Sequence, residues 1–201
     1  MAVQSQRKQR SDGERSRQTI LRAAASLATV DGLEGISIGN LAAHIGMSKS
    51  GLYAHFGSKE ELQLATVETA REIFGAEVVE PTQGIADPLE RLQALYDRFL
   101  SHVERRVFPG GCFFASVAAE FDTHPGVVAD RITAVQGEWT ELLKQLIREA
   151  QAAGSLPASE DPAQLAFELD AYALMGNTGF VLHDDPTYLE QARVAIDRRL
   201  K

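Results

Sequence analysis

The sequence predicts an all-α protein of about nine helices, with a small N-terminal helix–turn–helix head and a larger helical C-terminal body. Apolar residues recur at helical spacing through most of the 201 residues, and no segment shows the sustained alternation of a β-strand. Glycine and proline breaks divide the chain into segments of helical length. We expect the head to span residues 1–60 and the body to span residues 61–201.

The head is expected to begin with a flexible basic arm, residues 1–11. A helix should follow and end at Asp31-Gly32, because one of its sides is apolar up to that point. The apolar positions on this side are Ile20, Leu21, Ala24, Leu27 and Ala28.

Residues 37–59 predict two short helices joined by a tight turn. Ser37 is placed to cap the first helix, and Gly46 follows that helix where the turn needs a positive φ. Ser48 is placed to cap the second helix, which Leu52 and Phe56 anchor. The first helix has one apolar stripe at i, i+3, i+4 and i+7, formed by Ile38, Leu41, Ala42 and Ile45.

Six further helices are expected, each separated from the next by residues that interrupt helical structure. Pro81, Gly84 and Pro88 form the first of these breaks, and Asp184-Asp185-Pro186 form the last. The six helices are expected at residues 58–79, 87–104, 112–122, 126–153, 161–182 and 187–200.

The segment from about Arg15 to Leu64 resembles the DNA-binding domain of the TetR (tetracycline-repressor) family of transcriptional regulators. The residues that carry the resemblance are Ser48, Leu52-Tyr53, His55-Phe56 and the run Ser58-Lys59-Glu60-Glu61-Leu62. The resemblance implies a head that binds double-stranded DNA at a palindromic operator. It also implies a body that binds a small effector and forms a homodimer.

Several residues near the second helix are short, polar or basic and are not needed for a core. Lys49 can reach a guanine edge or a phosphate, while Ser50 and Gly51 permit close approach to base edges. The resemblance implies phosphate contacts for Tyr53 and His55, although His55 could instead pack at the edge of the head core. Lys59 and Ser37 lie at helix starts that favour anions, although Ser37 could simply be a cap. The predicted DNA-binding residues are Ser37, Ser48, Lys49, Ser50, Gly51, Tyr53, His55 and Lys59.

The charge of the chain is divided between head and body. The whole chain carries −8, but residues 1–59 hold eight Lys and Arg against four Asp and Glu, a net +4. Residues 60–201 hold twelve against twenty-four, a net −12. We therefore expect only the head to meet phosphate. In the arm, Arg7, Lys8 and Arg10 either enter a minor groove or contribute only diffuse attraction.

The body is expected to contain an apolar cavity for an apolar or aromatic effector. Helical bundles often host such pockets between aromatic side chains. The acidic body makes a strongly anionic effector a poor fit. Cys112 is alone in the chain, and a lone cysteine is usually a small core residue, with a redox role as the alternative. The candidate pocket residues are Phe99, Cys112, Phe114, Trp139, Phe167 and Tyr172.

The helix over 161–182 is rich in small residues, which permit close approach of another helix. The resemblance implies that the last two helices form a four-helix interface in a homodimer. Ordinary packing within one chain is the alternative. The candidate interface residues are Ala166, Gly176 and Gly179.

We expect a cytoplasmic protein that makes no membrane contact. No apolar run reaches the length of a transmembrane helix, and the basic N-terminus lacks the apolar segment of a signal peptide. The single cysteine excludes an intramolecular disulfide. The five histidines lack the spacing of a metal site, so neither a metal nor a cofactor is expected.

The favoured function is a ligand-responsive transcriptional regulator, most simply a repressor released by its effector. One alternative is a DNA-binding regulator without a small ligand, controlled by a protein partner or by oxidation of Cys112. Another is an enzyme with a vestigial head, but the sequence has no nucleophile–base pair, metal spacing or phosphate loop in its support.

Overall fold

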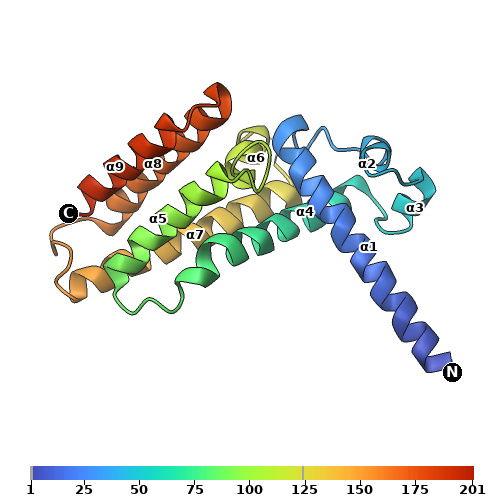
Figure 1. The fold of residues 1–201 in the computed structure, drawn as a ribbon, viewed down its shortest axis with the longest axis horizontal. Coiled ribbons are helices and arrows are strands. Elements are labelled where there is room, and N and C mark those ends of the chain that lie inside the picture. Colours follow the sequence, from blue (N-terminus) through green and yellow to red (C-terminus); the bar gives the residue numbers. More distant parts are fainter. Residues whose placement is uncertain (1, 124) are drawn as a thin grey trace.

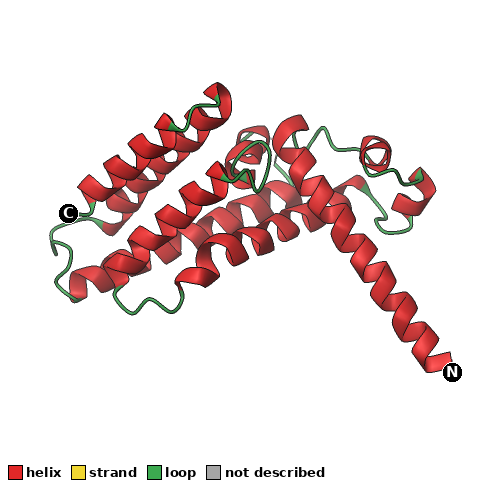
Figure 2. Ribbon diagram, viewed as in Figure 1, coloured by secondary structure: helices red, strands yellow, loops and turns green. Residues whose placement is uncertain are grey.

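The computed structural model describes residues 2–123 and 125–201, with side chains from residue 13 onward, and these residues form an all-α fold. Figures 1 and 2 show the head at one end and the pair α8 and α9 at the other. The predicted fold class is confirmed, and the described residues form nine α-helices. They are α1 (Ala2–Asp31), α2 (Ile38–His44), α3 (Lys49–Tyr53), α4 (Lys59–Phe74), α5 (Pro88–Glu104), α6 (Phe113–Phe121), α7 (Val127–Ala152), α8 (Pro162–His183) and α9 (Thr187–Arg199).

The backbone of α1 is helical from Ala2 onward. The prediction of a flexible arm is therefore wrong for residues 2–11. These residues include Ala, Gln, Arg and Lys but no glycine or proline, so their intrinsic preference allows the helix to extend. Met1 and the side chains of Arg7, Lys8 and Arg10 lie outside the described part, and the minor-groove contact stays a prediction.

The turn between α2 and α3 is built from contacts between close neighbours in sequence. Gly46 has φ +69°, and the N–H groups of Gly46 and Met47 donate to the carbonyl oxygens of Ala43 and Ala42 at 3.4 and 2.9 Å. This pairing is a Schellman motif, which satisfies the free carbonyls at the end of α2. The side chain of Ser48 then accepts from the N–H of Gly51 at 3.1 Å and caps α3.

Helix α4 joins the head to the body. Ser58 caps its start by accepting from the N–H of Glu61 at 3.0 Å. The helix packs on α1 at the head side and on α7 at the body side. After Phe74 the chain widens into a π-helical turn over Gly75–Val79 and a 3₁₀ turn over Glu80–Thr82. Because α4 belongs to both packing units, the boundary expected at residue 60 stays a prediction.

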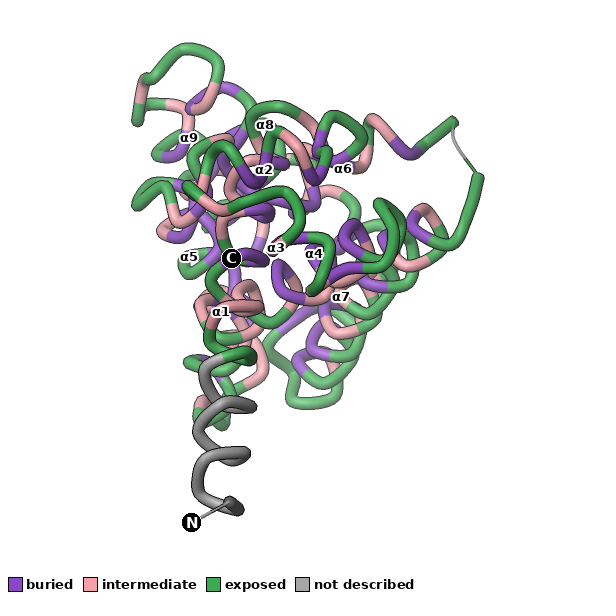
Figure 3. The backbone as a smooth tube through the Cα atoms, turned by 90° about the vertical axis from the view of Figure 1, so that its right-hand side faces the viewer, coloured by how far each residue is buried: buried purple, intermediate pink, exposed green. Residues whose placement is uncertain are grey.

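The body is a bundle of α5 to α9 that packs around a continuous apolar core. In Figure 3 the buried positions, in purple, lie on the sides of the helices that face one another. Asp87 and Asp161 cap α5 and α8, and each is followed by a proline in the first turn, where no N–H is needed. No described helix is long and apolar enough to cross a membrane.

The small residues of α8 serve packing within the chain. A Cβ on Gly176 would lie 2.7 Å from the Cβ of Ala192, and a Cβ on Gly179 would lie 2.1 Å from the ring of Tyr188. Both contacts are with α9, and Ala166 is also buried, at 2% exposed. These residues therefore pack within the protomer, as the alternative holds, and the expectation that they lie at a contact between copies stays a prediction. Sequence periodicity could not separate the two cases because α8 is apolar on both sides.

Gly179→Ala should destabilise the protein, because the ring of Tyr188 stacks on His183 and must move to admit a methyl group. We expect a loss of about 1–3 kcal/mol, the usual range for overpacking. Gly137→Ala on α7 is the matched control, since its Cβ would meet nothing within 4 Å. It should stabilise by about 0.5–1 kcal/mol. Urea denaturation at one protein concentration measures both, and equal effects would contradict the close packing of α8 on α9.

Candidate functional sites

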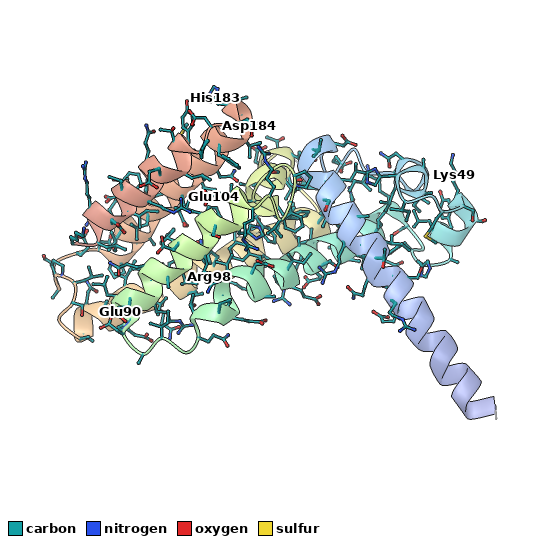
Figure 4. All side chains as sticks on the ribbon, viewed as in Figure 1. Lys49, Glu90, Arg98, Glu104, His183 and Asp184 are labelled. Carbon is teal, nitrogen blue, oxygen red and sulfur yellow. The ribbon has the colours of Figure 1, made fainter. Side chains whose placement is uncertain are left out.

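The second helix of the helix–turn–helix has one anchored face and one free face. Leu52 is fully buried, whereas Tyr53 is 59% exposed and Lys49 and Ser50 are also exposed. Lys49 lies at the end of the molecule opposite α8 and α9 (Figure 4). The arrangement can insert the start of α3 into a major groove while the head core holds its other side.

The serines of this surface are engaged in capping. Ser37 and Asn40 form a capping box, in which the Ser37 hydroxyl accepts from the N–H of Asn40 at 3.1 Å. Gly51 lies close to Ser48, and a Cβ there would come within 3.1 Å of the Ser48 hydroxyl. Ser37 and Ser48 are exposed, so their first role is to fix the backbone that DNA would meet.

Arg17 is a residue of the head that the sequence interpretation missed. Its guanidinium lies 4.4 Å from the centre of the Phe56 ring and donates to the backbone carbonyl of His55 at 2.6 Å. These contacts fix the turn after α3, while His55 itself is half-buried. The available signal was its spacing: Arg17 lies on the same side of α1 as the apolar positions Ile20 and Leu21.

Lys59 is engaged with the head in this structure. Its ammonium group donates to the carboxylate and to the backbone carbonyl of Glu34, both at 2.6 Å. The two side chains are about half exposed, so the ion pair is of the weak surface type. A DNA phosphate could therefore compete for Lys59, and its predicted phosphate contact would replace or share this pair.

The head is connected to the body by α4 and also by hydrogen bonds from backbone N–H groups to side-chain oxygens. The carboxylate of Glu120, on α6, accepts from the N–H groups of Leu33 and Glu34 at 3.1 and 3.0 Å. The N–H of Gly110 donates to the hydroxyl of Thr29 at 3.0 Å, close to the end of α1. Movement of α6 or of the loop before it would therefore displace the head residues that share these hydrogen bonds.

Three of the predicted pocket residues come together in the body, but around a side chain that was not among them. The ring of Phe74 has its centre 6.3 Å from Phe99, 6.4 Å from Phe114 and 5.3 Å from Trp139, all edge-to-face. The ring of His102 lies 5.9 Å from Phe74. The sequence indicated that Phe74 was apolar, but not that the end of α4 reaches into the body.

The two polar groups beside this aromatic cluster differ in how they are satisfied. Asp170 accepts from Tyr96 Oη at 2.9 Å and from Trp139 Nε1 at 3.0 Å. Burial raises the pKa of Asp170, while these two hydrogen bonds act against the rise. His102 is 0% exposed, and neither of its ring nitrogens has a hydrogen-bond partner in the described part of the chain. An unpaired buried polar group is unfavourable and calls for an explanation.

The other predicted pocket residues lie elsewhere. Phe167 is 69% exposed on α8, so the prediction that it lines the interior is wrong. Tyr172 borders a surface groove of about 200 Å³ between α8 and α9. A second surface hollow, of about 270 Å³, lies between α1 and α4 beside Gln18 and Thr69. Neither hollow includes a member of the aromatic cluster.

Cys112 is buried at the start of α6. Its N–H donates to the side-chain oxygen of Asn177 at 2.9 Å. Burial raises the pKa of the Cys112 thiol, which disfavours the reactive thiolate. The thiol therefore behaves as a core group, and the structure gives little support to control by its oxidation.

Because His102 is buried, we expect the free energy of unfolding to depend on pH. Burial lowers the pKa of His102 from 6.5 to about 4, with Glu77 opposing and Arg105 reinforcing the shift. As the pH falls below 6.5, His102 takes up a proton in the unfolded chain before it does so in the folded protein. The free energy of unfolding therefore keeps its full value above pH 6.5 and decreases as the pH falls toward 4. Between pH 7 and pH 5 the wild type should lose about 2 kcal/mol more than His102→Leu. Urea denaturation at both pH values tests this, and identical losses would contradict it.

Comparison with known proteins covers both parts of the chain. The family profile described as "Bacterial regulatory proteins, tetR family" matches residues 20–66. The profile described as "Tetracyclin repressor-like, C-terminal domain" matches residues 88–196, more than half of the chain.

Among curated relatives, the transcriptional regulator AcuR of Cereibacter sphaeroides is 27% identical over 157 residues, which cover 77% of this chain and 71% of AcuR. The HTH-type transcriptional repressor NicS of Pseudomonas putida is 27% identical over 148 residues, which cover 70% of this chain and 66% of NicS.

Two solved structures extend the likeness over nearly the whole fold. A TetR transcriptional regulator from Chloroflexus aurantiacus superposes with a TM-score of 0.86 at 29% identity, covering 94% of this chain and 95% of that one. AibR, solved in complex with isovaleryl coenzyme A and operator DNA, superposes with a TM-score of 0.73 at 26% identity, covering 90% and 96%. With its helix–turn–helix head and the matched C-terminal domain, the chain belongs to the TetR family of transcriptional regulators.

Proposed function

We propose that the chain is a homodimeric repressor that binds a palindromic operator through its heads and leaves it when a small effector enters the body. The observation that carries the DNA-binding part is the exposed basic face of α3, with Lys49 and Tyr53 outward over a buried Leu52. AibR supports the ligand-responsive part, since it is described with both isovaleryl coenzyme A and operator DNA. NicS, a repressor, supports the direction of control.

The coupling would run through α4. Its start lies under the head, and its last residue, Phe74, lies in the aromatic cluster of the body. An effector that prefers a conformation with the end of α4 displaced would also change the separation of the two heads. Such a ligand acts by its differential affinity for two states, and it needs no contact with DNA.

The dimer contact would lie on the outer face of α8. Exposed apolar side chains recur there at helical spacing, and α9 adds one more. A stripe of exposed apolar side chains on one helix is suited to an interface, and a stable homodimer buries on the order of 2,000 Å² or more. The side chains are Phe167, Leu174, Met175, Leu182 and Val194.

The aromatic packing around the partly buried Phe74 would also suit the alternative regulator that has no small effector. Against it stands His102, since a core that never opens would keep a fully buried imidazole unpaired. We further propose that the protein acts by binding rather than by catalysis, in the cytoplasm where its DNA partner lies. The position of the operator relative to a promoter would decide between repression and activation.

Phe167→Glu should convert the dimer to a monomer, because two negative charges would be buried across the two-fold contact. Val127→Glu is the matched control, since Val127 is an exposed apolar residue at the start of α7, outside α8 and α9, and an acidic residue suits a helix start. Sedimentation velocity at micromolar concentration gives the oligomeric state. A Phe167→Glu protein that stays dimeric would place the interface on another face.

Lys49→Ala should weaken operator binding and relax preference at one base position, if Lys49 reads a base worth about 1–3 kcal/mol of discrimination. Tyr53→Phe and Lys59→Ala should weaken binding to all sequences alike. Loss of Lys59 from both subunits should flatten the log–log salt dependence by about 2 units. Operator affinity measured against salt tests each change. Full affinity in all three variants would show that the recognition surface lies elsewhere.

A further inference from the structure

We propose that the effector site is the space that the ring of Phe74 fills in this structure, and that its ligand is a small, uncharged aromatic compound with a hydroxyl group that pairs with His102. This inference rests on the proposed function and deepens it. In this structure the side chain of Phe74 occupies the proposed site, and the ligand would displace it.

The walls around Phe74 are suited to a flat aromatic ring. Phe99, Phe114 and Trp139 present their rings to it at interplanar angles of 65°, 89° and 86°. Edge-to-face contacts of this kind match the positive edge of one ring to the negative face of another. The three rings come from α5, α6 and α7. A ring in this place therefore contacts three body helices at once and sets their positions relative to the end of α4.

Phe74 stands where the chain can turn it out of the cluster. It is the last residue of α4 and is directly followed by the π-helical turn Gly75–Val79. A π-helical turn carries one residue more than an α-helical turn, and such turns are frequent at functional sites. A shift of this turn to α pairing would rotate Phe74 by about 100° relative to the segment that follows. At Gly75 the turn is not packed against another segment, since a Cβ there would meet nothing within 4 Å.

His102 defines the polar part of the ligand. Its ring is fully buried, lies between Phe74 and Phe108 at 5.9 and 5.6 Å, and has no hydrogen-bond partner on either nitrogen in the described structure. A neutral imidazole has one donor and one acceptor nitrogen. A hydroxyl group on a ring in the place of Phe74 could satisfy either of them, which the phenylalanine ring cannot do.

The charges around the cluster favour an uncharged ligand. Glu77 is paired with Arg105 on the side of His102, so neither is free to neutralise a ligand. On the other side, the contacts of Asp170 in the described residues are with neutral Tyr96 and Trp139. A ligand carboxylate would therefore lie near the carboxylate of Asp170, whose charge no cation in these contacts neutralises, in a low-dielectric interior. A phenol-type hydroxyl avoids this cost.

Phenol and toluene are the probes, because they have nearly the same size and differ in the hydroxyl. Calorimetry on the full-length protein would compare the wild type, Phe74→Ala and the milder Phe74→Leu. We expect Phe74→Ala to bind phenol at least tenfold more tightly than the wild type, with Phe74→Leu between them, because the Phe74 ring no longer competes. Phe121→Ala is the control, because it removes a buried ring on α6 that has no ring contact with His102 among the described residues. It should bind phenol no better than the wild type.

The role of His102 is tested in the same background. Phe74→Ala should prefer phenol to toluene by at least tenfold, and adding His102→Leu should abolish that preference while toluene still binds. The site would be refuted if neither Phe74 variant bound phenol better than the wild type. An unchanged preference after His102→Leu would refute the assignment of the hydroxyl partner.

Operator binding separates this inference from the proposed function. Phenol at saturating concentration should lower the operator affinity of Phe74→Leu at least tenfold. If the wild type failed to bind any operator, the proposed function would fall, while the phenol measurements would still decide the site. If Phe74→Leu bound both phenol and operator without mutual effect, the cavity would not be the effector site.

Discussion

The packing of α4 against both the head and the body is the constraint on which the rest of the structure depends. Leu62 and Val67 are fully buried along the helix, and Phe74 at its end is partly buried against rings from three body helices. A helix transmits displacement along its axis because its backbone is internally hydrogen-bonded. A displacement of Phe74 along the helix axis therefore also displaces Ser58, at the base of the head, by a similar amount.

A second connection works in parallel with α4. Gly110 lies so close to the end of α1 that a Cβ there would be 1.9 Å from the carbonyl oxygen of Thr29. At Gly111, which has φ +83°, a Cβ would be 2.4 Å from the side-chain oxygen of Asn177. That oxygen accepts from the N–H of Cys112 at 2.9 Å. Since Asn177 is on α8, one short loop joins the head to the helix that carries the exposed apolar face. If the dimer forms through this face, as proposed, a change in dimer packing would reach the head through this loop.

The interior of the body combines a satisfied polar group with an unsatisfied one. Asp170 fixes Tyr96 and Trp139 through two hydrogen bonds and so gives three helices a defined arrangement. His102 has no comparable partner on either nitrogen in the described structure, and its burial is unfavourable as it stands. A regulator needs two states of similar free energy, and an unsatisfied group inside one of them reduces the gap. The cluster therefore has the energetic character expected of an element that can change state.

The sequence by itself determined the head, because caps and turns are made by residues close together in the chain. Ser37, Gly46 and Ser48 form the predicted contacts with residues no more than four positions away. Only the tertiary structure decided which side of α8 faces inward, so Phe167 is exposed while Gly179 lies against Tyr188. A helix that is apolar on both sides has no periodic signal to orient it. The partners of such a helix are set by packing between segments far apart in sequence.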